Sequence, residues 1–115
     1  MADELKLGRI TSTRLGKEDH GILTFWLDLD YGGTGQGFGG YSLGGDFTST
    51  VIEGILEAVG VDNWEDLKGE VVWVKRDGPK FGGKIIAIKA PDFVERAKWF
   101  DIEEASKKFL EKSKP

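Results

Sequence analysis

The side chains that could take part in chemistry are few and lie in the first third of the chain. His20 is the only histidine, and Asp19 precedes it in a polar turn. An imidazole beside a carboxylate can act as a general base, although it is equally an ordinary hydrogen-bonding turn residue. Asp28 and Asp30 stand two residues apart, which on a strand separates them by roughly 7 Å. This spacing suits a divalent cation rather than a shared proton, and it also suits a solvated strand face.

The chain contains no cysteine, so disulfides and thiolate metal sites are excluded. No serine stands in the sequence context of a catalytic nucleophile. We therefore predict a protein that is not an enzyme and needs no cofactor and no metal. The alternative is a small metal-dependent enzyme built on His20, Asp28 and Asp30.

A glycine-rich stretch over residues 30–45 is the feature around which the other elements are arranged. Half of its residues are glycine, and Tyr31, Phe38 and Tyr41 lie among them. Its segment GQGFGG matches the dinucleotide-binding pattern G-x-G-x-x-G, but no strand–helix unit surrounds it, so we predict no dinucleotide site. Two interpretations remain: a loop whose backbone N–H groups hold an anion, or a bulged strand against which another backbone or a tryptophan ring packs.

Charge is unevenly distributed along the chain. Residues 1–67 carry four basic and twelve acidic side chains, whereas residues 68–89 carry six basic and two acidic ones. The net charge of −4 disfavours a protein that coats DNA. The basic segment favours an anionic ligand, or it forms a solvated face.

Within that segment, residues 76–83 predict a long hairpin loop with Lys80 and Phe81 at its tip. Arg76 and Lys80 would stand on either side of Phe81, which gives a stacking ring flanked by two cations. The predicted ligand-binding residues are therefore Tyr31, Gln36, Phe38 and Tyr41 of the glycine-rich stretch and Lys75, Arg76, Lys80 and Phe81 of the basic hairpin.

Hydrophobic periodicity predicts the elements that must position these residues. Alternation over residues 22–30 places Leu23, Phe25, Leu27 and Leu29 on one strand face. Apolar residues at helical spacing (Ile52, Ile55, Leu56 and Val59) predict a helix over 46–59 that ends at Gly60. Further strands are predicted over 5–15, 36–43, 70–75 and 84–90, a helical turn over 63–67 and a last helix over 102–112.

This order predicts an α+β fold: an antiparallel, twisted or partly closed sheet of about five strands, with one central helix and a C-terminal helix. The length indicates one domain, 1–115. Its parts are the N-terminal strands and glycine-rich stretch (1–45), the helix and helical turn (46–69), the basic hairpin (70–91) and the C-terminal helical segment (92–115).

The sequence has no apolar run long enough to span a membrane and no secretory signal, which predicts a cytoplasmic protein with no membrane partner. Four tryptophans and a half-exposed sheet edge predict a homodimer.

Four segments carry a resemblance: GRITSTRLG, EDHGILTFWLDLDYGGTGQGFGGYSL, ILEAVGV and NWEDLKGEVVWVKRD. They resemble a group of small, uncharacterised proteins encoded in tailed-phage and prophage genomes. The resemblance covers most of residues 8–90, and DHGI…LDYGG.GQGFGGY is its most specific part. It implies a phage accessory protein in the host cytoplasm, and such proteins often inhibit or sequester host components, including nucleotide signals of anti-phage defence. It carries over no catalytic residues.

The predicted function is therefore a non-enzymatic phage accessory protein that binds a small anionic ligand such as a nucleotide, or a host protein, as a counter-defence inhibitor or sponge. The alternative is a nucleic-acid-binding accessory protein that uses Trp26, Trp73 and the basic strands. Salt separates these alternatives, because binding to a polynucleotide weakens steeply with salt.

Overall fold

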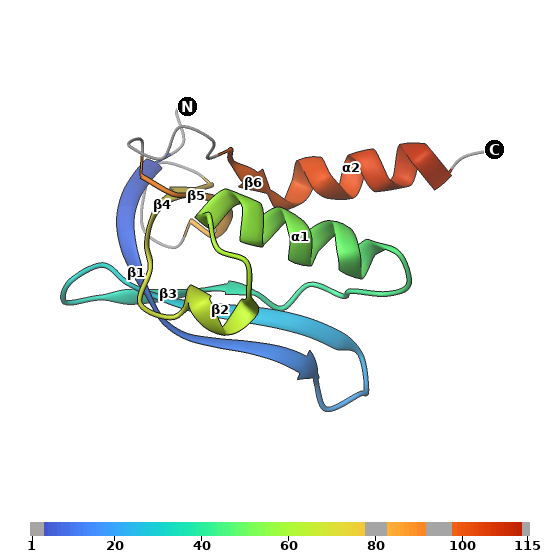
Figure 1. Ribbon diagram of the computed structural model, residues 1–115, viewed down its shortest axis with the longest axis horizontal. Coiled ribbons are helices and arrows are strands. Elements are labelled where there is room, and N and C mark those ends of the chain that lie inside the picture. Colours follow the sequence, from blue (N-terminus) through green and yellow to red (C-terminus); the bar gives the residue numbers. More distant parts are fainter. Residues whose placement is uncertain (1–3, 78–82, 92–97, 114–115) are drawn as a thin grey trace.

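The computed structural model describes residues 4–77, 83–91 and 98–113 (Figure 1). Its elements are β1 (Glu4–Lys17), β2 (Leu23–Asp30), β3 (Gly35–Gly39), α1 (Phe47–Val59), the 3₁₀ helix η1 (Trp64–Leu67), β4 (Val71–Arg76), β5 (Ile85–Lys89), β6 (Phe100–Asp101) and α2 (Ile102–Ser113). The predicted α+β class and order of elements are confirmed. The short strand β6 is an addition that the sequence did not predict.

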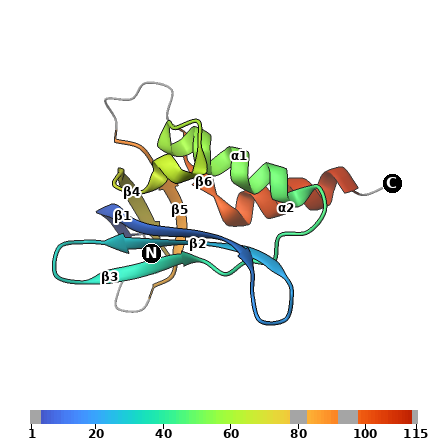
Figure 2. The same ribbon diagram turned by 60° about the horizontal axis from the view of Figure 1, so that its bottom comes forward.

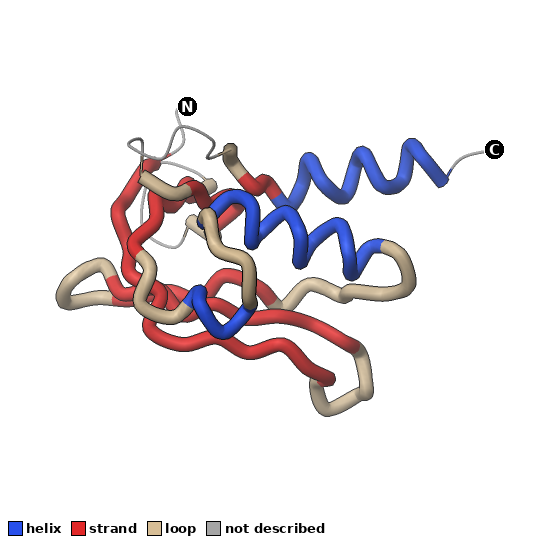
Figure 3. Tube along the Cα trace, in the orientation of Figure 1, coloured by secondary structure: helices blue, strands red, loops and turns tan. Residues whose placement is uncertain are grey.

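The strands form one open, antiparallel sheet in the order β3-β2-β1-β4-β5-β6. The sheet curves strongly, so residues of its two edge strands meet across the concave face: the rings of Phe38 in β3 and Phe100 in β6 lie 6.3 Å apart between centroids. Helices α1 and α2 lie together on one side of the strands (Figures 2 and 3). No helix within the described ranges is long and apolar enough to cross a membrane.

The alternation predicted for β2 is confirmed. Phe25, Leu27 and Leu29 are buried in the core, and Leu23 on the same predicted face is only half-buried, whereas the intervening side chains from Trp26 to Asp30 are exposed. Thr24 departs from the pattern and is buried, because its hydroxyl donates a hydrogen bond of 2.7 Å to the carbonyl oxygen of Tyr41. That bond ties the end of the glycine-rich stretch to β2.

Helix α1 spans the predicted residues but is rotated from the predicted face. Its buried side chains are Val51, Ile55, Ala58 and Val59. Ile52 and Leu56, which were expected to be buried, are only half-buried. The rotation of the helix is explained by the contact between Gly54 and Phe100. A Cβ at Gly54 would lie 2.7 Å from the Phe100 ring, so only a residue without a side chain lets this ring pack against α1. The helix ends at Gly60 with φ 88°, as predicted.

The glycine-rich stretch contains β3. The residues after it, 40–46, belong to no helix or strand. The Trp26 ring covers this part of the chain. A Cβ at Gly37 would lie 3.1 Å from the ring and one at Gly40 only 2.6 Å from it. Of the two interpretations of β3, the structure therefore shows the structural one, in which glycines let a tryptophan ring pack closely.

Candidate functional site

The fold brings three of the predicted binding residues together. The Tyr31 hydroxyl donates a 2.8 Å hydrogen bond to Gln36 Oε1, and Arg76 Nη1 lies 3.4 Å from the same oxygen. Gln36 Nε2 in turn donates to the carbonyl oxygen of Gly83 at 2.7 Å. The glycine-rich strand and the basic hairpin are thus joined by hydrogen bonds. These polar groups bond to one another, so the cluster fastens the hairpin to β3.

The other predicted residues are dispersed. Phe38 is only 1% exposed and packs in the core against Phe25, so the prediction that it offers a surface to a ligand is corrected. Lys75 lies on the opposite sheet face from buried Val74, with its Nζ 4.7 Å from the centre of the Trp99 ring. Lys80 and Phe81 lie outside the described residues.

The residues of the enzymatic alternative do not form a catalytic group. His20 is exposed in its turn, where its backbone N–H donates to Glu18 Oε1 at 3.3 Å. Asp28 accepts a hydrogen bond from the Ser12 hydroxyl, and Asp30 accepts one from the Gly32 backbone. Within the described part of the chain, no three His, Cys, Asp or Glu side chains are grouped so that they could hold a metal ion.

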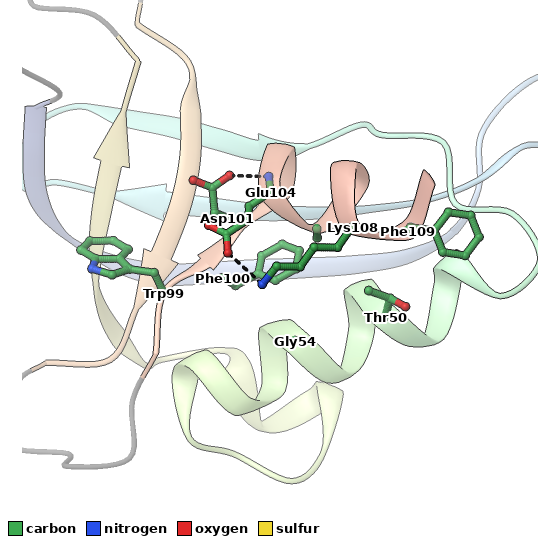
Figure 4. A pocket seen from close by; sticks show the side chains of 9 residues that line it. Thr50, Gly54, Trp99, Phe100, Asp101, Glu104, Lys108 and Phe109 are labelled. Atoms are coloured by element: carbon green, nitrogen blue, oxygen red, sulfur yellow. Dashed lines mark hydrogen bonds and ion pairs between the residues drawn. The ribbon is translucent and has the colours of Figure 1, made fainter. Parts of the chain in front are cut away.

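One hollow beside α2 has paired polar groups. It measures about 250 Å³ and lies between α1 and α2, with Phe100, Phe109 and Gly54 among its lining residues (Figure 4). Asp101 Oδ1 accepts a hydrogen bond of 2.9 Å from the Glu104 backbone and so caps α2. Glu104 also pairs with Lys108 at 3.0 Å. The charged lining residues of this hollow that the structure describes are thus two carboxylates and one ammonium group, a balance that does not favour an anionic ligand.

The second hollow, which we call the cationic hollow, measures about 440 Å³. Its lining comes from three segments that are far apart in the sequence: Tyr41, Ser42 and Phe47; Lys84; and Ile102, Glu103, Ser106 and Lys107. Lys84 and Lys107 are exposed, and neither makes an ion pair or side-chain hydrogen bond with any residue that the structure describes. Among the described lining residues, two ammonium groups thus accompany one carboxylate, so this part of the lining is net positive.

Tyr41 is held in place by the core. Its ring stacks on Phe25, with centroids 6.2 Å apart and planes at 25°. Burial raises the pKa of the Tyr41 phenol; Lys84 opposes the rise, while Glu103 and Asp101 add to it. The phenol is therefore protonated at neutral pH and can donate a hydrogen bond into the hollow.

Of the predicted residues that the structure describes, only Tyr41 lines this hollow, and the sequence analysis did not propose Lys84 or Lys107 as binding residues. Lys84 is one of the cations of the basic segment, but no local sequence pattern indicates that it lies close to Lys107 of α2. No protein-family model matches this chain, and the comparison with curated proteins finds no match.

Proposed function

We propose that this chain is a non-enzymatic binding protein that holds a small anion in the cationic hollow. The observation that carries the proposal is the convergence of Lys84 and Lys107, two lysines without partners among the described residues, on a hollow of about 440 Å³ beside Tyr41. Ligand sites commonly measure about 300–1,000 Å³. The hollow is therefore large enough for a small organic anion.

The lining supplies the groups that an anion such as phosphate needs. Lys84 and Lys107 provide mobile positive charges, and the neutral Tyr41 hydroxyl is a hydrogen-bond donor. Ser42 and Ser106 add two hydroxyls that can donate or accept.

The biological role that fits is a phage accessory protein that sequesters a small anionic host signal in the cytoplasm. The resemblance to phage-encoded proteins supports this context. A sponge needs affinity and abundance rather than turnover, so a small fold with one open hollow would suffice. Binding of a host protein would use the same charged surface, but the hollow favours a small molecule.

The nucleic-acid alternative has less support from the geometry. One face of the Trp26 ring is covered by Gly37 and Gly40, and Asp28 lies on the same strand face. A polynucleotide would meet negative charge there. Affinity that changes little between low and moderate salt would favour the small ligand, because phosphate contacts along a polynucleotide give a steep dependence.

We also propose that the chain forms a homodimer through the outer face of the sheet. Leu5 and Leu7 of β1 are 52% and 48% exposed, and Leu7 stands opposite half-buried Trp73 of β4. Ile10, on the other face of β1, is buried in the core with Val51 and Ile55 of α1, so the helices pack on the opposite side of the sheet from this strip (Figure 2). A twofold axis through the strip would bury it against a second copy.

The binding proposal is tested with the double variant Lys84→Ala/Lys107→Ala and pyrophosphate as the probe, measured by isothermal titration calorimetry. Lys17→Ala/Lys68→Ala is the matched control, because it removes two exposed lysines elsewhere. A charge-assisted contact contributes about 1.5–3 kcal/mol, so losing two should weaken binding at least hundredfold. The control should bind like the wild type. Equal affinities for the two double variants would refute the assignment of the site.

A further inference from the structure

The cationic hollow continues into a second compartment. A neighbouring hollow of about 290 Å³ is lined by Ser42, Gly44, Phe47, Ser106, Phe109 and Leu110. Three of these residues, Ser42, Phe47 and Ser106, also line the cationic hollow. The two spaces are therefore the ends of one groove beside α2.

The two ends of this groove differ in chemistry. Lys84 and Lys107 belong only to the first end. Phe109 and Leu110 belong only to the second, where the rings of Phe47 and Phe109 lie 5.1 Å apart between centroids. Leu110 is 59% exposed, the most exposed large apolar side chain among the described residues. The groove thus has a cationic end, two serines in its middle and an aromatic, apolar end.

We propose that this groove binds a nucleotide lengthwise, with its phosphates at Lys84 and Lys107 and its base against Phe47, Phe109 and Leu110. This inference rests on the proposed function and deepens it by naming the ligand class. An inorganic anion would fill only the cationic end. A ligand that fills both needs an anionic group joined to a flat apolar body, and a nucleobase offers a face that packs on aromatic rings.

The middle of the groove favours a nucleotide over an anionic lipid, which also joins an anion to an apolar body. Ser42 and Ser106 stand where the two ends meet. A ribose presents hydroxyls that can bond to serine side chains, whereas an acyl chain there would leave both serines without a ligand partner. The apolar end is also short and open, and it offers no enclosed channel for a long chain.

Gly44 allows the apolar end to be closed without touching the cationic end. Its φ is not in the left-handed region, and a Cβ there would meet no atom within 4 Å. Gly44→Phe should therefore place a ring in the space that the base would use. Leu110→Ser is a second, milder variant on an exposed side chain, and Leu15→Ser, at a leucine 40% exposed on β1, is its matched control.

The experiment compares ADP, GDP, CDP and UDP with pyrophosphate and with dodecyl phosphate, by titration calorimetry on the full chain. We expect the nucleotides to bind the wild type at least about tenfold more tightly than pyrophosphate. Gly44→Phe and Leu110→Ser should each reduce that ratio toward one while the affinity for pyrophosphate stays unchanged. Leu15→Ser should keep the wild-type ratio. Circular dichroism verifies that each variant is folded. If Gly44→Phe is not folded, the result for Leu110→Ser alone decides whether the apolar end binds the base.

Two results would overturn the inference while leaving the proposed function intact. Equal affinity for nucleotides and pyrophosphate, with both lost in Lys84→Ala/Lys107→Ala, would show an anion site without a base compartment. Tighter binding of dodecyl phosphate than of any nucleotide would assign the apolar end to an acyl chain. If no probe binds the wild type, both the inference and the proposed function are refuted.

Discussion

Replacing Gly40 by alanine tests whether the glycine-rich segment is built to seat the Trp26 ring. Gly40 has φ +81°, and an added Cβ would lie 2.6 Å from the ring carbon Cζ2 of Trp26. The backbone is held in place, because the Gly40 N–H donates a 2.8 Å hydrogen bond to the Phe25 carbonyl oxygen. An alanine at this position therefore meets both a backbone penalty and a steric one.

Gly21 allows the two penalties to be separated. Its φ of +79° matches that of Gly40, but no atom lies within 4 Å of the position of its Cβ. Gly21→Ala should therefore cost only the left-handed backbone, about 1–2 kcal/mol. Overpacking typically costs a further 1–3 kcal/mol or so. We expect Gly40→Ala to lower the free energy of unfolding by about 2–5 kcal/mol, the excess over Gly21→Ala being the contact with Trp26.

The assay is urea denaturation followed by far-ultraviolet circular dichroism, because tryptophan fluorescence would itself change when Trp26 is altered. A double-mutant cycle with Trp26→Ala isolates the steric part. The cost of Gly40→Ala should fall by about 1–3 kcal/mol when the ring is absent. An unchanged cost in both backgrounds, or a cost equal to that of Gly21→Ala, would refute the packing role assigned to this glycine.

Three further predictions concern the core, the phenol and the assembly. Leu27→Ala, at a fully buried position, should cost about 2–5 kcal/mol in urea denaturation, and an unchanged midpoint would contradict the assignment of the strand faces. The pKa of Tyr41 is raised by folding, so stability should fall as the pH rises above about 10, the ordinary tyrosine value, and Tyr41→Phe should lessen that fall in melting temperature. Light scattering at micromolar concentration should give a dimer mass for the wild type and a monomer mass for Leu7→Asp. A monomer mass for the wild type would refute the proposed homodimer.

The sequence predicted the strands well wherever one side chain in two had to be buried. The alternation of β2 is an example, because a slip of one residue would expose Phe25, Leu27 and Leu29 together. The strand β6 could not be found in this way. It has two residues, Phe100 and Asp101, and it is a strand only because they pair with Ile88 and Ala87 of β5. Such a pairing depends on tertiary structure and has no periodic pattern of its own.

Helix α1 shows the limit of periodicity for predicting a face. Apolar residues occur on more than one side of this helix. The face with Ile52, Ile55 and Leu56 therefore fits the helical period as well as the face that is buried in the structure. What selected the face was a contact between distant residues, since Gly54 lies against Phe100. The sequence indicated the helix and its end at Gly60, whereas its rotation followed from packing.

The candidate site was the least predictable part for the same reason. Glycines and aromatics drew attention to residues 30–45, but there the structure uses Phe38 for the core and Gly37 and Gly40 to seat Trp26. The hairpin cations were expected to act together, yet Arg76 joins the Gln36 cluster and Lys75 faces Trp99 on the other side of the sheet. The cationic hollow is lined by three segments that are far apart in the sequence, so no contiguous sequence motif indicates it.

The two lysines of the cationic hollow can also be tested through the stability of the free and of the ligand-bound protein. Lys84 and Lys107 form no ion pair with any residue that the structure describes, so we expect them to contribute little to the stability of the ligand-free fold. Removing them should leave the melting temperature of the free protein nearly unchanged. A ligand that binds only the folded state stabilises it by RT ln(1 + [L]/Kd), about 2.7 kcal/mol at a hundredfold excess over Kd. If the two lysines bind the ligand, Lys84→Ala/Lys107→Ala should lose the ligand-dependent rise in melting temperature while the melting temperature of the free protein stays unchanged. If they only keep the protein soluble, the ligand should raise the melting temperature of the variant as much as that of the wild type.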